Sequence, residues 1–306
     1  MSAAFAAFVG LRRRWLLQAG LGLSLPLALP QPSWAAESLA ELCQRLEQQS
    51  GGQVGVFALH TGSRRQFAYR AEQRFAMCST FKLLLAGAVL ARIDAGQLRH
   101  DQRVRFGPRD LVPHAPVTGA LLESGTLSAS MTVLDLCAAI LLESDNPAAN
   151  LLLPLVGGPP GLTRFFRELG DAETRLDRIE PALNSNLPDD PRDTSTPASF
   201  VGLMERLLCS DFLSEASRQQ LLVWMNEAET GLGRLRGGAP QDWPAGDKTG
   251  TGANGAVNDA AIFFPPKQAP ILMAVFMRGS SRPLPELNAV HAELASRVLA
   301  SLSAAT

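Results

Sequence analysis

The sequence has little net charge. Its 28 Lys and Arg residues are balanced by 29 Asp and Glu residues, which gives a formal net charge of -1 at pH 7. A chain balanced in this way lacks the basic surface that binding to nucleic acid or to an anionic membrane requires. We therefore expect no nucleic-acid partner, and a small-molecule ligand fits the composition better.

The sequence also has few cysteines and histidines. Its four cysteines are Cys43, Cys78, Cys137 and Cys209. None belongs to a Cys-x-x-Cys motif, and the histidines are not interleaved with them as in a zinc site. A zinc hydrolase is therefore disfavoured, and we expect neither a metal nor another cofactor. Because Cys137 and Cys209 lie in apolar helical patterns, we expect free thiols and no disulfide.

The N-terminus carries the pattern of an export signal. Three arginines at residues 12–14 precede an apolar run at residues 15–29, and Ser33-Trp34-Ala35 follows. This order predicts a signal cleaved near Ala35, and paired arginines are typical of the twin-arginine type. The alternative is a membrane anchor, but Pro26 interrupts a run already shorter than the ~20 residues that span a bilayer. We expect a periplasmic protein without an anchor after cleavage.

Strand patterns occur at both ends of the mature chain. A helix through Leu39 and Leu46 ends at Gly51, and alternating apolar residues from Val54 predict a hairpin that turns at residues 60–63. Three more strands are expected at residues 246–251, 256–264 and 271–277, before a final helix with Leu287, Val290, Leu294 and Val298 on one face. The two ends of the chain should therefore share one sheet.

Helical patterns fill the middle of the chain. Helices are expected over residues 79–95, over residues 132–142 with a capping box at Thr132, and from Pro197 onward. These elements predict an α/β plus all-α fold, in which terminal helices flank a five-stranded antiparallel sheet. The α/β domain would comprise residues 36–77 and 227–306, and the inserted all-α domain residues 78–226. The active site should lie in the cleft between them.

The first motif with chemical meaning is Ser79-Thr-Phe-Lys82 at the start of a helix. Residues three apart on a helix face the same side, so the Lys82 amine can reach the Ser79 hydroxyl. A serine needs a base to act as a nucleophile, and a lysine with a lowered pKa can serve. The alternative is an N-cap serine followed by a solvated lysine.

Two further triplets follow along the chain. Ser144-Asp145-Asn146 lies at a helix junction marked by Pro147, where an ordinary helix cap is the alternative. Residues 248–251, Lys-Thr-Gly-Thr, lie on a predicted strand, where glycine lets a ligand approach the backbone closely. An edge strand with a solvated lysine is the alternative there.

Together, Ser-x-x-Lys, Ser-Asp-Asn and Lys-Thr-Gly resemble the motifs of the penicillin-recognising serine enzymes. Residues 178–184, Arg-Ile-Glu-Pro-Ala-Leu-Asn, with Arg-Asp-Thr at 192–194, are similar to the Ω-loop of class A serine β-lactamases. The resemblance covers nearly the whole mature chain. It implies a monomeric hydrolase that opens the lactam ring of penicillins and cephalosporins, with Arg178 and Asp193 closing the loop as an ion pair.

The resemblance also implies the roles of individual residues. Ser79 would be the nucleophile, Lys82 its proton partner, Ser144 the proton shuttle to the lactam nitrogen, and Glu180 the base that activates the deacylating water. Either Glu180 or Lys82 could be the acylation base. The backbone N–H groups of Ser79 and Thr251 would form the oxyanion hole. The remaining residues implied in substrate or water binding are Asn146, Asn184, Lys248, Thr249, Gly250 and Thr251.

The sequence departs from common family patterns at three places. Residues 256–258 lack the arginine that many members use to bind the substrate carboxylate; Arg234 resembles the alternative arginine, and Arg236 is the second choice. Gly252 stands where carbapenem-hydrolysing relatives carry the disulfide partner of the cysteine matching Cys78, which puts activity on carbapenems in doubt. His114 replaces a frequent aromatic residue at the cleft edge and either stacks on substrate or is solvated.

Two other functions share part of this pattern. A D-alanyl-D-alanine carboxypeptidase has the three motifs but no deacylating glutamate, and a non-catalytic β-lactam sensor is acylated without turnover. The segment from Glu180 to Asn184 argues against both, because a water-activating loop has no purpose in either.

Overall fold

The computed structural model describes residues 37–122 and 126–304. The predicted export signal, with its cleavage near Ala35, lies outside these residues. A five-stranded antiparallel sheet forms the centre, as predicted. Its strands, in spatial order, are β2 (Gln66–Tyr69), β1 (Gln53–His60), β9 (Ile271–Arg278), β8 (Val257–Phe263) and β7 (Ala245–Thr251).

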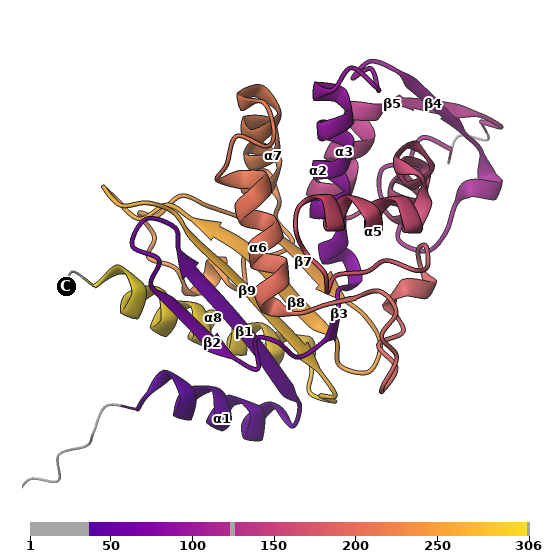
Figure 1. Cartoon of the computed structure of the whole chain (residues 1–306). Coiled ribbons are helices and arrows are strands. Elements are labelled where there is room, and N and C mark those ends of the chain that lie inside the picture. Colours follow the sequence, from indigo (N-terminus) through magenta and orange to yellow (C-terminus); the bar gives the residue numbers. More distant parts are fainter. Residues whose placement is uncertain (1–36, 123–125, 305–306) are drawn as a thin grey trace, which may run out of the picture. The chain divides into compact units, whose positions relative to one another are not determined.

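Helices from the two ends of the described chain cover one face of this sheet (Figure 1). Helix α1 (Leu39–Ser50) begins with a capping box between Ser38 and Glu41 and ends at Gly51, whose φ of 68° suits glycine. Helix α8 (Leu284–Ser303) buries Leu287, Val290, Leu294 and Val298, the face expected from their spacing. The terminal helices and the sheet therefore share one apolar core.

The opposite face of the sheet packs on the helical part of the chain. Phe276 and Phe200 meet there edge to face, with ring centroids 5.3 Å apart. The helices of this part are α2 (Phe81–Asp94), α3 (Val133–Leu142), α4 (Asn146–Leu152), α5 (Gly158–Glu168), α6 (Pro197–Leu208) and α7 (Glu215–Glu227). Residues of both the sheet and these helices belong to a single core cluster. No helix in the described ranges is both long and apolar enough to cross a membrane.

The expectation that residues 78–226 contain helices only is wrong in detail. Strands β4 (Arg103–Phe106) and β5 (Ala129–Thr132) form a two-stranded ribbon within them, and β3 (Phe75–Ala76) pairs with β6 (Thr194–Ser195). These strands have two to four residues, too few for an alternating pattern to stand out. Cys209 also differs from the prediction: it caps α6 and is exposed, whereas Cys137 is buried.

Short segments between these elements position the polar residues singled out above. The 3₁₀ turn η1 (Cys78–Thr80) leads into α2, and the junction of α3 and α4 holds residues 143–145. A long loop at residues 178–193, here called the Ω-loop, contains η4 (Ala182–Asn184). The other 3₁₀ turns are η2 (Pro108–Asp110), η3 (Leu153–Val156) and η5 (Arg236–Gly238).

Candidate active site

Ser79 lies in the 3₁₀ turn just before α2, one helical turn from Lys82. The Lys82 Nζ donates to Ser79 Oγ at 3.0 Å, as the three-residue spacing predicted. Cys78, directly before the serine, has a φ of 47°. Such a conformation is uncommon for a residue with a side chain and is often found at functional sites. This backbone conformation positions Ser79 at the N-terminus of α2.

Lys82 is buried and contacts residues from three chain segments. Besides Ser79, its Nζ donates to Ser144 O at 2.7 Å, to Ser144 Oγ at 3.3 Å and to Asn146 Oδ1 at 2.5 Å. The same atom lies 3.1 Å from Glu180 Oε1, and neither side chain is exposed to solvent. The structure therefore brings together the serine, lysine and glutamate that were predicted from separate motifs.

Burial governs the protonation of the two active-site lysines. It lowers the pKa of Lys82, although the negative charge of Glu180 opposes the shift. Burial also lowers the pKa of Lys248 to about 7, with the positive charge of Lys82 as the second cause. The Lys248 amine can consequently exist without a proton near neutral pH, which an exposed lysine cannot do.

Glu180 is held from both its main chain and its side chain. The Asn150 side chain accepts from Glu180 N at 2.9 Å and donates to Glu180 O at 2.9 Å. The Asn184 amide donates to Glu180 Oε2 at 2.5 Å. Glu180 Oε1 forms the ion pair with Lys82, whereas the buried Asn184 Oδ1 accepts no hydrogen bond from any described residue. One unpartnered acceptor is thus left directly beside the Glu180 carboxylate.

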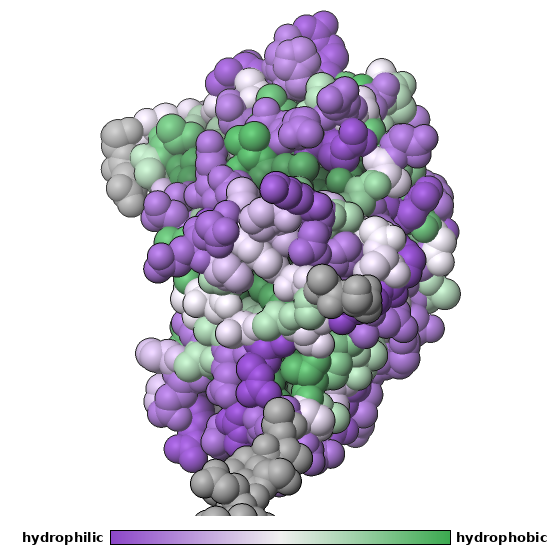
Figure 2. Space-filling view, turned by 90° about the vertical axis from the view of Figure 1, so that its left-hand side faces the viewer, coloured by the Kyte–Doolittle hydropathy of each residue, from purple (hydrophilic) through white to green (hydrophobic). Residues whose placement is uncertain are grey.

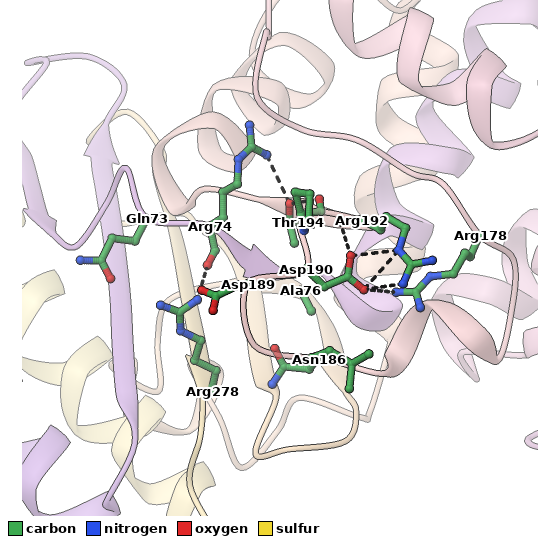
Figure 3. Close-up of a pocket in the computed structure, with 12 residues that line it drawn as sticks. Gln73, Arg74, Ala76, Arg178, Asn186, Asp189, Asp190, Arg192, Thr194 and Arg278 are labelled. Carbon is green, nitrogen blue, oxygen red and sulfur yellow. Dashed lines mark hydrogen bonds and ion pairs between the residues drawn. The ribbon is translucent and has the colours of Figure 1, made fainter.

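Ion pairs close the base of the Ω-loop, as predicted. Arg178 Nε donates to Asp193 Oδ2 at 2.6 Å, and the other Asp193 oxygen accepts from the main-chain N–H groups of Asp177 and Arg178. Figure 3 shows a second layer on the outer side, where Arg178 and Arg192 both face Asp190. The ends of the loop are therefore fixed by charge.

Strand β7 places Lys248 against Ser144. Lys248 Nζ donates to Ser144 Oγ at 3.1 Å, so this hydroxyl is contacted by both active-site lysines. The next residue, Thr249, donates to the Thr230 hydroxyl at 2.8 Å. Gly250 is needed at its position, because a Cβ there would lie 2.7 Å from Met77 O and 3.1 Å from Ser79 N. The strand therefore runs directly alongside the serine turn.

Of the two candidate arginines, Arg234 lies at this strand. Its guanidinium donates to Thr251 Oγ1 at 2.7 Å, to Gly250 O at 3.1 Å and to Asn258 O at 2.6 Å. Arg236 instead faces Asp247 and the carbonyl of Ala228. The preference for Arg234 over Arg236 at the candidate site therefore agrees with the geometry.

Asn146 and His114 line the same cavity as strand β7 but come from the helical part of the chain. The Asn146 amide is fixed by its bonds to Lys82 and to Pro113 O, the latter at 2.8 Å. His114 is exposed, and its Nε2 lies 3.0 Å from Glu143 O, which holds the ring at the rim. The cavity has a volume of about 310 Å³, within the usual size range of ligand pockets. Its lining residues are Ser79, His114, Ser144, Asn146, Asn184, Thr230, Arg234, Thr249 and Thr251.

Two carboxyl groups lie buried behind β7. Asp247 and Asp259 occupy neighbouring strands, with Thr249 opposite Asp259 in the register. Burial raises the pKa of Asp259 well above its usual value, and the nearby charge of Asp247 adds to the shift. The raised pKa disfavours a negative charge on Asp259 beneath Lys248, which helps the strand keep its positive character toward the cavity.

This chain is similar in sequence to known proteins. A family model described as "Beta-lactamase enzyme family" matches residues 37–302. Among curated proteins, "Carbapenem-hydrolyzing beta-lactamase KPC" from Klebsiella oxytoca is 43% identical over 281 residues, covering 92% of this chain and 94% of the relative. "Beta-lactamase AST-1" from Nocardia asteroides is 44% identical, covering 83% and 80%. This chain belongs to the class A serine β-lactamases.

Solved structures agree with this assignment. An ancestral class A β-lactamase has a TM-score of 0.83 and 49% identity, covering 86% of this chain and all of that one. A β-lactamase from Xanthomonas campestris has a TM-score of 0.81 and 42% identity, covering 86% and 98%. The class A family and its activity, both predicted from the motifs, are therefore confirmed. This β-lactamase hydrolyses the cyclic amide of β-lactam antibiotics.

Several polar residues around the β-lactamase site were not predicted. Asn150 lies one helical turn after Asn146, so its helical spacing was an available signal. Thr230 stands in a segment without a recognisable pattern. Asn258 donates to Ala76 O and Met77 O across the core, at 2.7 and 3.0 Å. No local motif could identify this contact, because its partners lie 181 and 182 residues away in the sequence.

Proposed function

We propose that Ser79 attacks the lactam carbonyl and forms an acyl-enzyme. The contact between Ser79 Oγ and Lys82 Nζ supports this, since an amine whose pKa is lowered by burial can take the hydroxyl proton. Glu180 is the alternative acylation base, because it lies 3.1 Å from the same amine. Ser144 would then deliver a proton to the lactam nitrogen, supported by its contacts with both lysines.

In the second half of the reaction, we propose that Glu180 activates the water that hydrolyses the ester. A water molecule could donate to Asn184 Oδ1 and to the Glu180 carboxylate, and the carboxylate could take its proton as the water attacks. The two hydrogen bonds from the Asn150 side chain fix the main chain of Glu180 and so keep its carboxylate in place for this step. This arrangement separates a hydrolase from a protein that is only acylated.

The same geometry supports a binding mode for the substrate. The cationic side chains of Lys248 and Arg234, with the hydroxyls of Thr249 and Thr251, suit the carboxylate that β-lactams carry. The N–H groups of Ser79 and Thr251 would stabilise the oxyanion, with Gly250 allowing the strand to approach. Asn146 would hold the side-chain amide of the drug, and His114 would flank it at the rim.

The observation that carries this mechanism is the convergence of Ser79, Ser144 and Glu180 on one lysine. We test it with Glu180→Ala mixed with a penicillin and followed by mass spectrometry. We expect a persistent adduct on Ser79, because acylation continues while deacylation stops. Ser79→Ala is the control and should show no adduct. Rapid turnover by Glu180→Ala, without accumulation of the adduct, would overturn the assigned role of Glu180.

We propose that penicillins and cephalosporins are substrates and that carbapenems are poor ones. A Cβ at residue 252 would lie 2.6 Å from Cys78 Sγ, so the two positions are adjacent, but glycine offers no sulfur for a disulfide. Steady-state kinetics with one drug of each class test this. We expect kcat/KM for a carbapenem to be at least roughly a hundredfold below that for a penicillin. Comparable values would contradict the proposal.

The organisation of the whole protein is part of the proposal. Residues 36–77 and 227–306 would form an α/β domain, and residues 78–226 a mainly helical domain, with the active site in the cleft between them. The lining of the cavity supports this, because it draws Ser144 from one segment and Thr249 from the other. Residues 1–35 would direct export to the periplasm, where the cleaved protein would lack an anchor.

We also propose that the enzyme is a monomer. Its exposed large apolar side chains occur on several separate elements, including Leu127, Val223 and Leu284. On the face in Figure 2, hydrophilic side chains interrupt the apolar areas. A stable homodimer would require a larger continuous apolar surface.

A further inference from the structure

Two asparagines join the Ω-loop to the turn between β7 and β8. Asn186 Nδ2 donates to Ala253 O at 3.2 Å and to Asn254 O at 3.0 Å. In return, Asn254 Nδ2 donates to Ser185 O at 3.0 Å and to Asn186 O at 3.3 Å. We call this reciprocal pair, Asn186 and Asn254, the asparagine latch. Each asparagine side chain donates to main-chain carbonyls at or next to the other asparagine.

Both asparagines adopt the backbone conformation that favours such a contact. Asn186 has a φ of 43° and Asn254 a φ of 51°. Among residues with a side chain, asparagine enters this left-handed region at low cost, and its amide is short enough to bond to nearby main chain. The choice of residue at both positions therefore suits the turn and the contact at once.

The latch lies next to groups of the catalytic site on both sides. A main-chain bond from Ala253 N to Asn184 O, 2.9 Å long, runs beside it. Asn184 in turn donates to the Glu180 carboxylate, while Thr251 precedes Ala253 by two residues and bonds to Arg234. The two segments are in direct contact, because a Cβ on Gly252 would lie 2.7 Å from Asn184 O.

The outer side of the Ω-loop is poorly supported by packing. Cavities of about 290 and 470 Å³ lie behind it, and Asn186, Leu187, Asp189 and Arg278 border both. Figure 3 shows Asn186 and Arg278 at the edge of the first cavity, with the ion pairs of Arg178 gathered at its other end. The ion pairs fix the ends of the loop, so its middle depends on hydrogen bonds to the β7–β8 turn.

We propose that Asn186 and Asn254 are positioning residues for deacylation. By holding the middle of the Ω-loop against the turn after β7, the latch keeps the Asn184 amide and the Glu180 carboxylate aligned with the ester on Ser79. Its loss should slow deacylation more than acylation, because Lys82, Ser144 and the serine turn lie on other segments. The inference rests on the proposed function of Glu180 and Asn184.

The test separates acylation from deacylation in single-turnover kinetics of a penicillin. Asn186→Gly and Asn254→Gly remove the amides without penalising the left-handed backbone. The matched control is Asp189→Gly, in the same loop. Asp189 also has a positive φ, 57°, and its side chain makes no hydrogen bond or ion pair within the described residues. Any effect of added glycine flexibility should appear in the control as well.

We expect both latch variants to deacylate roughly tenfold more slowly than the control, with acylation within about twofold, since small misplacements of a catalytic group are costly in rate. The double variant should lose less than the product of the two single effects, because the two side chains act on one contact. Amide hydrogen exchange at Ala253 should accelerate in both variants. Deacylation equal to that of the control, or a parallel loss of acylation, would overturn the proposal.

A parallel measurement on Glu180→Gln separates failure of the latch proposal from failure of the role proposed for Glu180. If Glu180→Gln accumulates the acyl-enzyme while the latch variants deacylate normally, the latch proposal alone fails. If Glu180→Gln deacylates at the normal rate, the function assigned to Glu180 fails, and the latch proposal fails with it.

Discussion

At the scale of single residues, the site depends on charges placed where water cannot easily reach them. Lys82 and Lys248 are both buried, and each lowers its own cost of burial by donating to oxygen atoms around it. Placing two amines beside one hydroxyl, that of Ser144, lets a proton move along a short chain of contacts. The protonation of Lys248 should therefore be visible in the dependence of binding on pH.

Substrate binding should weaken above neutral pH. Since the pKa of Lys248 is lowered to about 7, the free enzyme loses this ammonium charge as the pH rises through that value. Binding of a penicillin to Ser79→Ala, measured by calorimetry between pH 6 and 9, should show a Kd that rises by up to tenfold per pH unit above about 7.

The control for this prediction is Ser79→Ala combined with Lys248→Ala. Its binding should be weaker and nearly independent of pH over the same range, because Arg234 keeps its charge throughout. A Kd in Ser79→Ala that stays constant from pH 6 to 9 would contradict the assignment of Lys248 as the titrating group.

At the scale of elements, α8 carries a histidine that has no access to solvent. His291 Nε2 lies 3.1 Å from Val257 O, and Nδ1 has no hydrogen-bond partner among the described residues. Burial lowers the pKa of His291 to about 3, and the charge of Arg234 adds to the shift. Packing of α8 against β8 therefore holds this ring neutral.

Because the pKa of His291 is lowered, we expect the folded protein to lose stability in mild acid. Between pH 6.5 and 3 the unfolded chain binds a proton at residue 291 that the folded protein does not bind, so the free energy of unfolding falls as the pH falls. The slope should approach about 1.4 kcal/mol per pH unit below the pKa of the unfolded histidine. Urea denaturation at pH 6.5, 5.5 and 5.0 measures it.

His291→Gln is the comparison for this experiment, since glutamine can donate to Val257 O but does not titrate. Its unfolding free energy should change less with pH than that of the natural sequence, by the contribution of one proton. Equal slopes in the two proteins would show that His291 does not govern the acid sensitivity, leaving carboxylates with a lowered pKa, such as Asp190, as its source.

At the scale of the whole molecule, the sequence predicts most of the sheet and the contact between Ser79 and Lys82. Residues 79 and 82 are close in the chain, and their helical spacing alone dictates contact. The hairpin from Val54 and the apolar face of α8 follow from simple periodicities. These features depend on neighbours within a few residues, which is why a single sequence suffices to predict them.

Features built by distant partners could not be predicted in this way. The ribbon of β4 and β5 is too short for a pattern, and the asparagine latch unites residues that are 67 and 68 positions apart. Thr230 becomes part of the cavity only because Thr249 lies beside it in the folded protein. Such contacts are properties of the tertiary structure and leave no periodic trace in the chain.

Asn258 has a consequence for how the enzyme becomes active during its synthesis. Its amide donates to the carbonyls of Ala76 and Met77, three and two residues before the nucleophile, and its oxygen accepts from Met277 N. The serine therefore leaves the ribosome long before the strands that anchor its turn. A chain that ends before β9 would carry every catalytic side chain but lack the Met277 N–H that holds the Asn258 oxygen, so we expect it to be inactive towards a β-lactam.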